Sequence, residues 1–103
     1  MSIATIDVQP RVKNVAITNH LLSVQIQDGR TVSVPLTWYP RLLHATAQER
    51  TNWRVFEDTA GRDVIFWEHL DELIPVIALL TGTSSRESKR SFERWRKARA
   101  MRK

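Results

Sequence analysis

The alternation of apolar and polar residues on both sides of Asp28-Gly29 constrains the fold of this chain most. Residues 21–27 read LLSVQIQ and residues 30–36 read RTVSVPL, so nearly every second side chain is apolar. Period two indicates strands that are buried on one face. An Asp-Gly pair between two such runs is the strongest short-range hairpin signal, and it predicts a turn whose two central residues have positive φ. Pro35 marks the end of the second strand or a sheet edge.

Three further segments read as strands. Residues 12–17 are roughly alternating, and Trp53, Val55 and Glu57 share one face of the next run. The segment DVIFWEH, residues 63–69, is the fifth predicted strand and is apolar on both faces. A strand with two apolar faces is typical of a central position or of a cover by a helix.

Short helices fill the gaps between these strands. Thr37 is expected to cap a helix with Pro40 in its first turn, from which Leu42 and Leu43 face inward. Residues 70–82, LDELIPVIALLTG, read as a helix that packs on the sheet, with Pro75 in its first turn and Gly82 at its end. Asp71 and Glu72 are expected to favour the start of that helix through its dipole. The predicted fold class is α+β, with one domain over residues 1–82.

The last 21 residues differ from the rest in charge. Residues 83–103 contain nine Lys or Arg and two Glu, a net charge of +7, whereas residues 1–82 carry −2. The composition predicts a basic helix that starts near Ser84 or Ser85. We take its charged and aromatic side chains as candidate binding residues for a nucleic acid or a protein partner: Arg86, Lys89, Arg90, Phe92, Arg94, Trp95, Arg96, Lys97, Arg99, Arg102 and Lys103.

This tail has three alternative interpretations. It is a solvated extension, or a helix that contacts a nucleic-acid backbone, or a helix that enters an acidic protein groove. Phe92 and Trp95 lie about 60° apart on a helix, but cations surround them, so no clean apolar stripe for a membrane surface is present. The two rings are expected either to stack on unpaired bases or to dock on the domain's own core. We expect the tail's binding to be separable from the fold, so that truncation after Gly82 leaves the melting temperature nearly unchanged.

A second candidate site combines aromatic and arginine side chains in residues 38–53. In one interpretation Trp38 and Trp53 are core residues and the arginines pair with Glu49 or Asp71. In the other they form an interface patch of the composition found at binding hot spots. The possible patch comprises Trp38, Tyr39, Arg41 and Arg50, with Glu49, Asn52 and Trp53 nearby.

No catalytic, cofactor-binding or metal-binding residue is predicted. The chain has no cysteine, and its three histidines show no i, i+4 pair of the kind that binds zinc. No Gly-x-Ser-x-Gly element and no glycine-rich phosphate loop occur. The 103 residues suit one domain, and neither a signal peptide nor an apolar run of about 20 residues is present, so a cytoplasmic, non-enzymatic protein is expected.

Three stretches together resemble a known family: DGRTVSVPLTWYPRLLHATAQERTNW, DVIFW and LDELIPVIALLTG. They are similar to small prokaryotic proteins grouped as the domain of unknown function 2442 family, over about residues 11–82. The resemblance implies a compact α+β fold with a curled antiparallel sheet, membership of toxin–antitoxin-like gene pairs, and a helical DNA-binding segment in some relatives. Phe66 stands where the family often has His, and Leu73 where it often has a second Asp, which puts a polar site there in doubt.

These observations lead to one functional expectation and one alternative. The chain is expected to be a non-enzymatic, antitoxin-like binding and regulatory module of a bacterium, whose basic tail contacts nucleic acid or an acidic protein. The alternative is a structural subunit that docks in a larger protein or ribonucleoprotein assembly. A toxin-like protein or an assembly subunit is the expected protein partner, and DNA or RNA the expected ligand of the tail.

Overall fold

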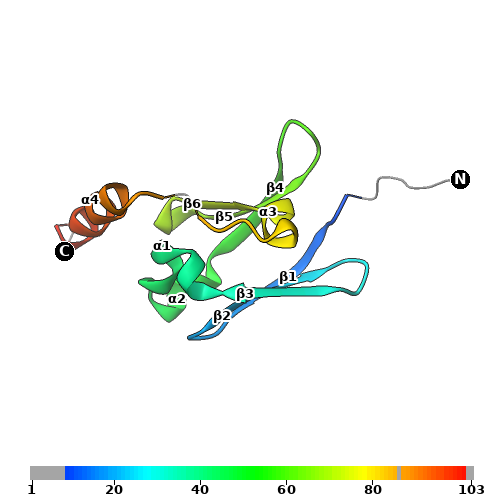
Figure 1. Cartoon of the computed structure of the whole chain (residues 1–103), viewed down its shortest axis with the longest axis horizontal. Coiled ribbons are helices and arrows are strands. Elements are labelled where there is room, and N and C mark those ends of the chain that lie inside the picture. Colours follow the sequence, from blue (N-terminus) through cyan, green and yellow to red (C-terminus); the bar gives the residue numbers. More distant parts are fainter. Residues whose placement is uncertain (1–8, 86, 102–103) are drawn as a thin grey trace, which may run out of the picture.

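The computed structural model describes residues 9–85 and 87–101, which form two small antiparallel sheets with short helices (Figure 1). The first sheet has the strand order β1-β2-β3 and the second β4-β5-β6. The strands are β1 Val12–Ile17, β2 Leu21–Ile26, β3 Thr31–Pro35, β4 Trp53–Glu57, β5 Asp63–Trp67 and β6 Glu72–Pro75. The helices are α1 Pro40–Leu43, α2 Ala47–Thr51, α3 Val76–Thr81 and α4 Lys89–Ala100. The predicted α+β class and the strand pairs on either side of Asp28-Gly29 are confirmed.

The β2–β3 and β4–β5 hairpins each use a three-residue loop that ends in glycine. In the first, the N–H of Gly29 donates to the carbonyl of Ile26 at 3.0 Å, and Ile26 in turn donates to Arg30 at 2.8 Å. Gly29 has φ of 100°, whereas Asp28 does not have positive φ, so the predicted pair of positive-φ residues is wrong. A turn followed by one left-handed residue closes a three-residue loop, and only glycine adopts that backbone conformation without strain.

The core lies between the two sheets and contains side chains from both. Trp67, from the middle strand of the second sheet, is fully buried, and its indole N–H donates to the carbonyl of Arg50 at 3.1 Å. Its buried neighbours come from the first sheet, the second sheet and the helices, and include Leu22, Val24, Ile26, Val34, Leu36, Leu42, Ile65, Leu70, Ile74, Val76 and Leu79. The central position predicted for the DVIFW strand is therefore confirmed.

The helix predicted from Leu70 is wrong in its first half. Asp71 has a left-handed backbone with φ of 53°, and residues 72–75 then form β6 beside β5. Alternation places Glu72 and Ile74 inside, while Leu73 is 52% exposed on the outer face of the sheet. Helix α3 begins only at Val76, so Asp71 and Glu72 do not lie in its first turn. Gly82, with φ of 77°, ends it as predicted.

The short helix after β3 also differs in detail from the prediction. Tyr39 precedes α1 and no side chain caps the helix, so Thr37 is not the cap. Pro40 occupies the first turn, as expected, where the missing N–H removes no hydrogen bond. Leu42 is buried, but Leu43 is exposed, because a single helical turn can direct only one of two neighbouring side chains into the core.

Candidate nucleic-acid interface

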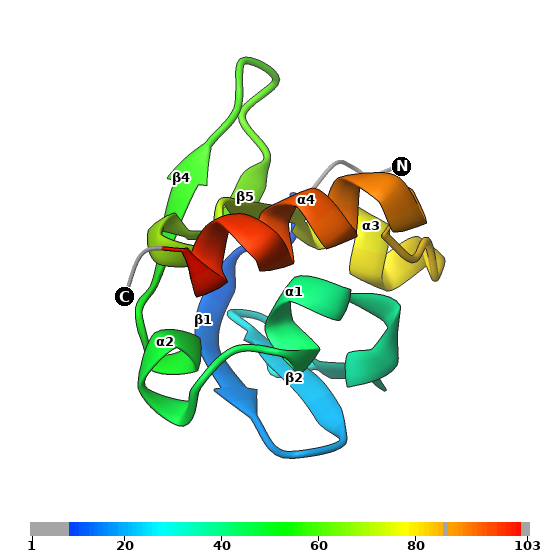
Figure 2. The ribbon, with the colours of Figure 1, turned by 90° about the vertical axis from the view of Figure 1, so that its left-hand side faces the viewer.

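Helix α4 carries most of the predicted binding residues and starts later than expected. The Ser88 hydroxyl accepts a hydrogen bond from the N–H of Ser91 at 3.0 Å, so Ser88 is the cap and not Ser84 or Ser85. The helix then runs through Ala100 across one end of the molecule, above α1 and α2 in the view of Figure 2. Arg86, Arg102 and Lys103, which the sequence also suggests, lie outside the described residues.

The two aromatic residues of α4 face the body of the protein. The indole N–H of Trp95 donates to the carbonyl of Leu70 at 3.0 Å. The Phe92 ring is stacked on that of Trp95, with centroids 5.6 Å apart, and lies 4.9 Å from the His44 ring. Of the two alternatives drawn from the sequence, base stacking or docking on the domain, the structure has the second.

Two ion pairs fix the ends of this contact. Before α4, Glu87 accepts hydrogen bonds from Nε of Arg41 at its two carboxylate oxygens, at 3.0 and 2.9 Å. Near the end of α4, Arg99 donates to both oxygens of Glu49 at 2.8 and 2.9 Å. Bidentate pairs of this kind fix orientation as well as distance. Both guanidinium groups also lie over the Trp95 ring, 5.4 Å and 4.6 Å from its centroid.

The Arg99 contact changes the acidity of Glu49. The hydrogen bonds from Arg99, together with the N–H of Thr46, lower the pKa of Glu49 to about 2. The same carboxylate closes the capping box of α2, in which Thr46 and Glu49 bond each other's backbone N–H. One side chain of a five-residue helix therefore both starts that helix and holds the end of α4.

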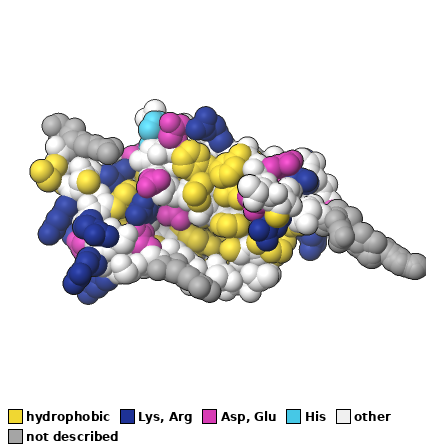
Figure 3. All heavy atoms as spheres, turned by 90° about the horizontal axis from the view of Figure 1, so that it is seen from above, with side chains coloured by type: hydrophobic (Ala, Val, Ile, Leu, Met, Phe, Trp, Pro, Cys, Tyr) yellow, Lys and Arg dark blue, Asp and Glu magenta, His cyan; other side chains and the backbone are white. Residues whose placement is uncertain are grey.

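The opposite side of α4 is a cationic stripe formed by Arg90, Arg94 and Lys97. At 100° per residue these three positions span about 60°, centred opposite Phe92, Trp95 and Arg99. All three are exposed, and no described carboxylate forms a salt bridge with them. Lys89 and Arg96 lie together on one side of the helix, about 80° or more from the edge of the stripe, and Arg96 pairs with Glu93 at 3.1 Å. Figure 3 shows the Lys and Arg side chains gathered at this end of the molecule.

The predicted patch of residues 38–50 is not an exposed surface. Tyr39 is 3% exposed, and its hydroxyl donates a hydrogen bond to the carbonyl of Thr83. Burial raises the pKa of this hydroxyl to about 12. Trp38 packs against the core. Arg41 reaches Asp71 at 3.8 Å as expected, but its main partner, Glu87, was not predicted. Arg50 binds the carbonyls of Leu42 and Leu43 and does not pair with Glu49.

Glu72 is a buried acid that sequence reasoning placed wrongly at a helix start. It lies on the inner face of β6, near Arg41 and Glu87. Burial raises the pKa of its carboxyl to about 7, against the opposing effect of Arg41. The alternation of LDELIP, with Glu72 in step with Leu70 and Ile74, is the signal that would have placed it inside.

The polar residues around His69 form a surface turn after β5. Glu68 accepts a hydrogen bond from Arg54 at 2.7 Å, and the amide nitrogen of Asn52 lies 3.5 Å from Nδ1 of His69. Among the described residues, no group of three or more His, Asp or Glu side chains could hold a metal ion. Within the same residues, no helix has the length and apolar character needed to cross a membrane.

Comparison with known proteins gives a family and a fold. The model of a family described as "Protein of unknown function (DUF2442)" matches residues 12–85. A crystal structure at 2.75 Å resolution, of a protein of unknown function from Rhodospirillum rubrum, is similar with a TM-score of 0.59 and 20% sequence identity. The similarity covers 78% of this chain and 95% of that one, and at this identity it concerns the fold alone. No curated protein matches the chain.

Proposed function

The chain belongs to the DUF2442 family, whose description gives no function, and we propose that it is a non-enzymatic module that binds nucleic acid through the cationic stripe of α4. The observation that carries this proposal is the division of α4 into two faces. One face is fixed to the body by Trp95 and Arg99, and the other exposes Arg90, Arg94 and Lys97. The family match ends at residue 85, so the proposal rests on the residues of this chain.

The dimensions of the stripe suit a phosphate backbone. Lys97 is seven positions after Arg90, which is about 10 Å along a helix axis. Along one strand of duplex DNA, successive phosphates rise by about 3.4 Å along the duplex axis and also turn around it, so the stripe is comparable in length to two or three phosphates. A helix held against the body presents these charges without first being ordered, and this lowers the entropic cost of binding.

The docking of the two aromatic rings on the body favours duplexes over single strands as the expected nucleic acid. Phe92 and Trp95 face the body and are therefore withdrawn from base stacking. Contacts from arginine and lysine to phosphates carry no sequence information. We therefore expect the protein to bind duplexes of different sequence with similar affinity, and to gain nothing on single strands.

The dependence of affinity on salt tests this proposal. The variant Arg90→Gln/Arg94→Gln/Lys97→Gln removes three charges from the stripe. The control Arg30→Gln/Arg54→Gln/Arg62→Gln removes three exposed charges from the body, each of which pairs with a surface acid. Binding of a labelled duplex is measured by fluorescence anisotropy between about 50 and 200 mM salt.

The stripe variant is expected to bind about tenfold more weakly or worse at about 50 mM salt, with a log–log slope shallower by two to three. The control variant should keep the slope of the native chain. Equal losses in the two variants would show that only net charge matters, and would contradict a defined interface. Absence of binding by the native chain at about 50 mM salt would reject the proposal altogether.

A protein partner is the second candidate, and a specific feature of the first sheet favours it. The outer edge of β1 has backbone groups that bond no described residue. Under this candidate the chain is an antitoxin-like regulator or a subunit of an assembly. A complex recovered with tagged protein would then survive nuclease treatment, whereas a complex formed through nucleic acid would not.

A further inference from the structure

The edges of the two sheets approach each other without pairing. Strand β1 is the edge of the first sheet and β4 the edge of the second, and no ladder of hydrogen bonds joins them. We call the boundary between β1 and β4 the seam. At one end of the seam, Asp63 accepts hydrogen bonds from Arg11 and from the N–H of Val12, both at 2.8 Å. Asp63 is 7% exposed, whereas the Arg11 side chain is 40% exposed, so water reaches the arginine side of this contact. The other end of the seam, at the end of β1, has no such contact among the described residues.

Near Ile17, some backbone N–H and C=O groups of β1 point away from β2. The turn bond from Thr18 N–H to the carbonyl of Leu21, and the register Ala16↔Ser23, identify the residues that bond to β2. Because bonding alternates along an antiparallel strand, the N–H and C=O groups of Val15 and Ile17 point to the open side. They bond no other described residue. An edge of this kind is a template for another strand.

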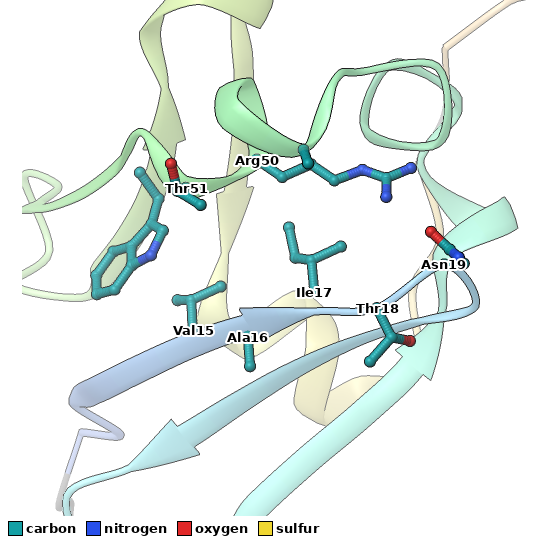
Figure 4. Close-up of a pocket in the computed structure, with 9 residues that line it drawn as sticks. Val15, Ala16, Ile17, Thr18, Asn19, Arg50 and Thr51 are labelled. Carbon is teal, nitrogen blue, oxygen red and sulfur yellow. The ribbon is translucent and has the colours of Figure 1, made fainter.

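A cavity of about 600 Å³ lies beside this edge, between β1 and α2. Val15, Ile17 and Trp53 provide its apolar lining, and Ile17 and Trp53 are only partly buried. In Figure 4, Ile17 points from β1 across the cavity toward Arg50. A volume in this range is typical of ligand pockets, and alternate side chains of an added strand commonly enter such pockets.

Arg50 gives the cavity a positive charge on the side opposite β1. Its Nε donates to the carbonyl of Leu42 at 3.0 Å and its Nη2 to the carbonyl of Leu43 at 2.9 Å. These acceptors are neutral, and no described carboxylate forms a salt bridge with the guanidinium. A charged group that is partly buried gains most from a ligand of opposite charge, because water screens it little.

We propose that the outer edge of β1 binds an extended, acidic segment of a partner polypeptide as an additional strand. The segment pairs with the backbone of Val15 and Ile17, places one apolar side chain beside Trp53, and directs a carboxylate to Arg50. Side chains two residues apart lie on the same face of a strand, about 7 Å from each other. The recognised pattern is therefore an apolar residue followed, or preceded, by an acidic residue two positions away. This inference uses no residue of α4 and is independent of nucleic-acid binding.

Titration of the full chain with a defined peptide tests the inference. The probe is acetyl-Thr-Val-Thr-Glu-Thr-amide, followed by the amide resonances of the ¹⁵N-labelled protein. Two control peptides have the same length: one is N-methylated at alternate residues, which removes the edge hydrogen bonds, and one has Gln in place of Glu. The amides of Val15 and Ile17 are expected to shift in a saturable way and to exchange more slowly with solvent.

A pair of proline variants separates edge pairing from loss of fold. Ile17→Pro removes an outward N–H of β1 and should reduce affinity for the probe at least about tenfold, because proline cannot donate to an added strand. Thr31→Pro places proline at an outward N–H on the opposite edge of the same sheet and should leave affinity unchanged. Arg50→Gln should lower the affinity for the Glu peptide to the affinity that the native chain has for the Gln peptide.

Several outcomes would overturn the inference. Unchanged resonances of Val15 and Ile17, or equal binding of the N-methylated peptide, would exclude strand addition at this edge even if Ile17→Pro does not fold. An equal loss in the two proline variants would show a general effect on the sheet. Binding of the Gln peptide as tight as that of the Glu peptide would reject an acidic partner.

Discussion

The body of the protein and helix α4 are held by different interactions. In the body, side chains such as Leu22, Ile65 and Trp67 are fully buried and come from both sheets. Helix α4 has no fully buried residue, and it is attached by one indole hydrogen bond, two partly buried rings and two bidentate ion pairs. Apolar burial does not depend on charge screening, whereas ion pairs depend on both pH and salt, above all the Arg99–Glu49 pair, which is more exposed than the Arg41–Glu87 pair. The stability of the body and the docking of α4 should therefore respond to different perturbations.

The largest effect is expected in the centre of the body. Trp67→Ala should lower the free energy of unfolding by about 3–5 kcal/mol, because it leaves a large cavity and removes the partner of the Arg50 carbonyl. Urea denaturation measures this change, and high salt should not alter it. A midpoint equal to that of the native chain would show that the two sheets do not share this core.

The next largest effect is expected from a buried acid in the body, which should make the stability of the protein depend on pH. The pKa of Glu72 is about 7 in the folded protein, above its value in the unfolded chain, so ionisation of Glu72 costs no stability below about pH 4.5. The cost grows as pH rises and is complete above about pH 7, where it reaches up to about 3 kcal/mol. Glu72→Gln should therefore stabilise the protein at about pH 8 and have little effect at about pH 4. Destabilisation at the higher pH would contradict this assignment.

Removal of α4 should have a moderate effect on stability. Truncation after Ser85 keeps the whole region matched by the family model and the bond between Tyr39 and Thr83. It should cost about 2 kcal/mol, since it removes one partly buried indole and two ion pairs. The near-zero change in melting temperature predicted from sequence is therefore no longer expected. Thermal denaturation of the full and the truncated chain distinguishes a loss of stability of this size from a near-zero change.

The smallest expected change concerns the ion pair at the end of α4. Because the pKa of Glu49 falls to about 2 on folding, its contribution is present above about pH 4.5 and is lost as pH falls toward 2. Glu49→Gln keeps an acceptor for Thr46 but removes the charge, and it should cost about 1 kcal/mol at neutral pH. The difference between the two chains should vanish near pH 2 and shrink in high salt. A difference independent of pH would show that the Arg99 contact contributes no charge–charge stabilisation.

Local patterns in the sequence predict most strands of the body correctly. They fail where a short apolar run fits both a helix and a strand, and where contacts between residues far apart in the sequence determine the structure. Alternation identified the strands around Asp28-Gly29 and the central strand with Trp67. The run after Leu70 misled, because a short apolar segment fits a strand or a helix, and the left-handed Asp71 that separates them has no clear signal. From the sequence alone, the docking of α4 on the domain is only one of several alternatives. Its partners, Glu49 and the Leu70 carbonyl, are 50 and 25 residues away from Arg99 and Trp95, and no periodicity connects them.

The environment of the Trp95 indole tests most directly whether α4 is a fixed part of the domain with its cations turned outward. The indole N–H resonance of Trp95 can be followed by NMR in the free protein and in a complex with a DNA duplex. We predict an N–H protected from solvent exchange by its bond to Leu70, with the same protection in the complex, while the resonances of Arg90, Arg94 and Lys97 shift. Fast exchange of this N–H in the free protein, or loss of its protection when the duplex binds, would contradict the account.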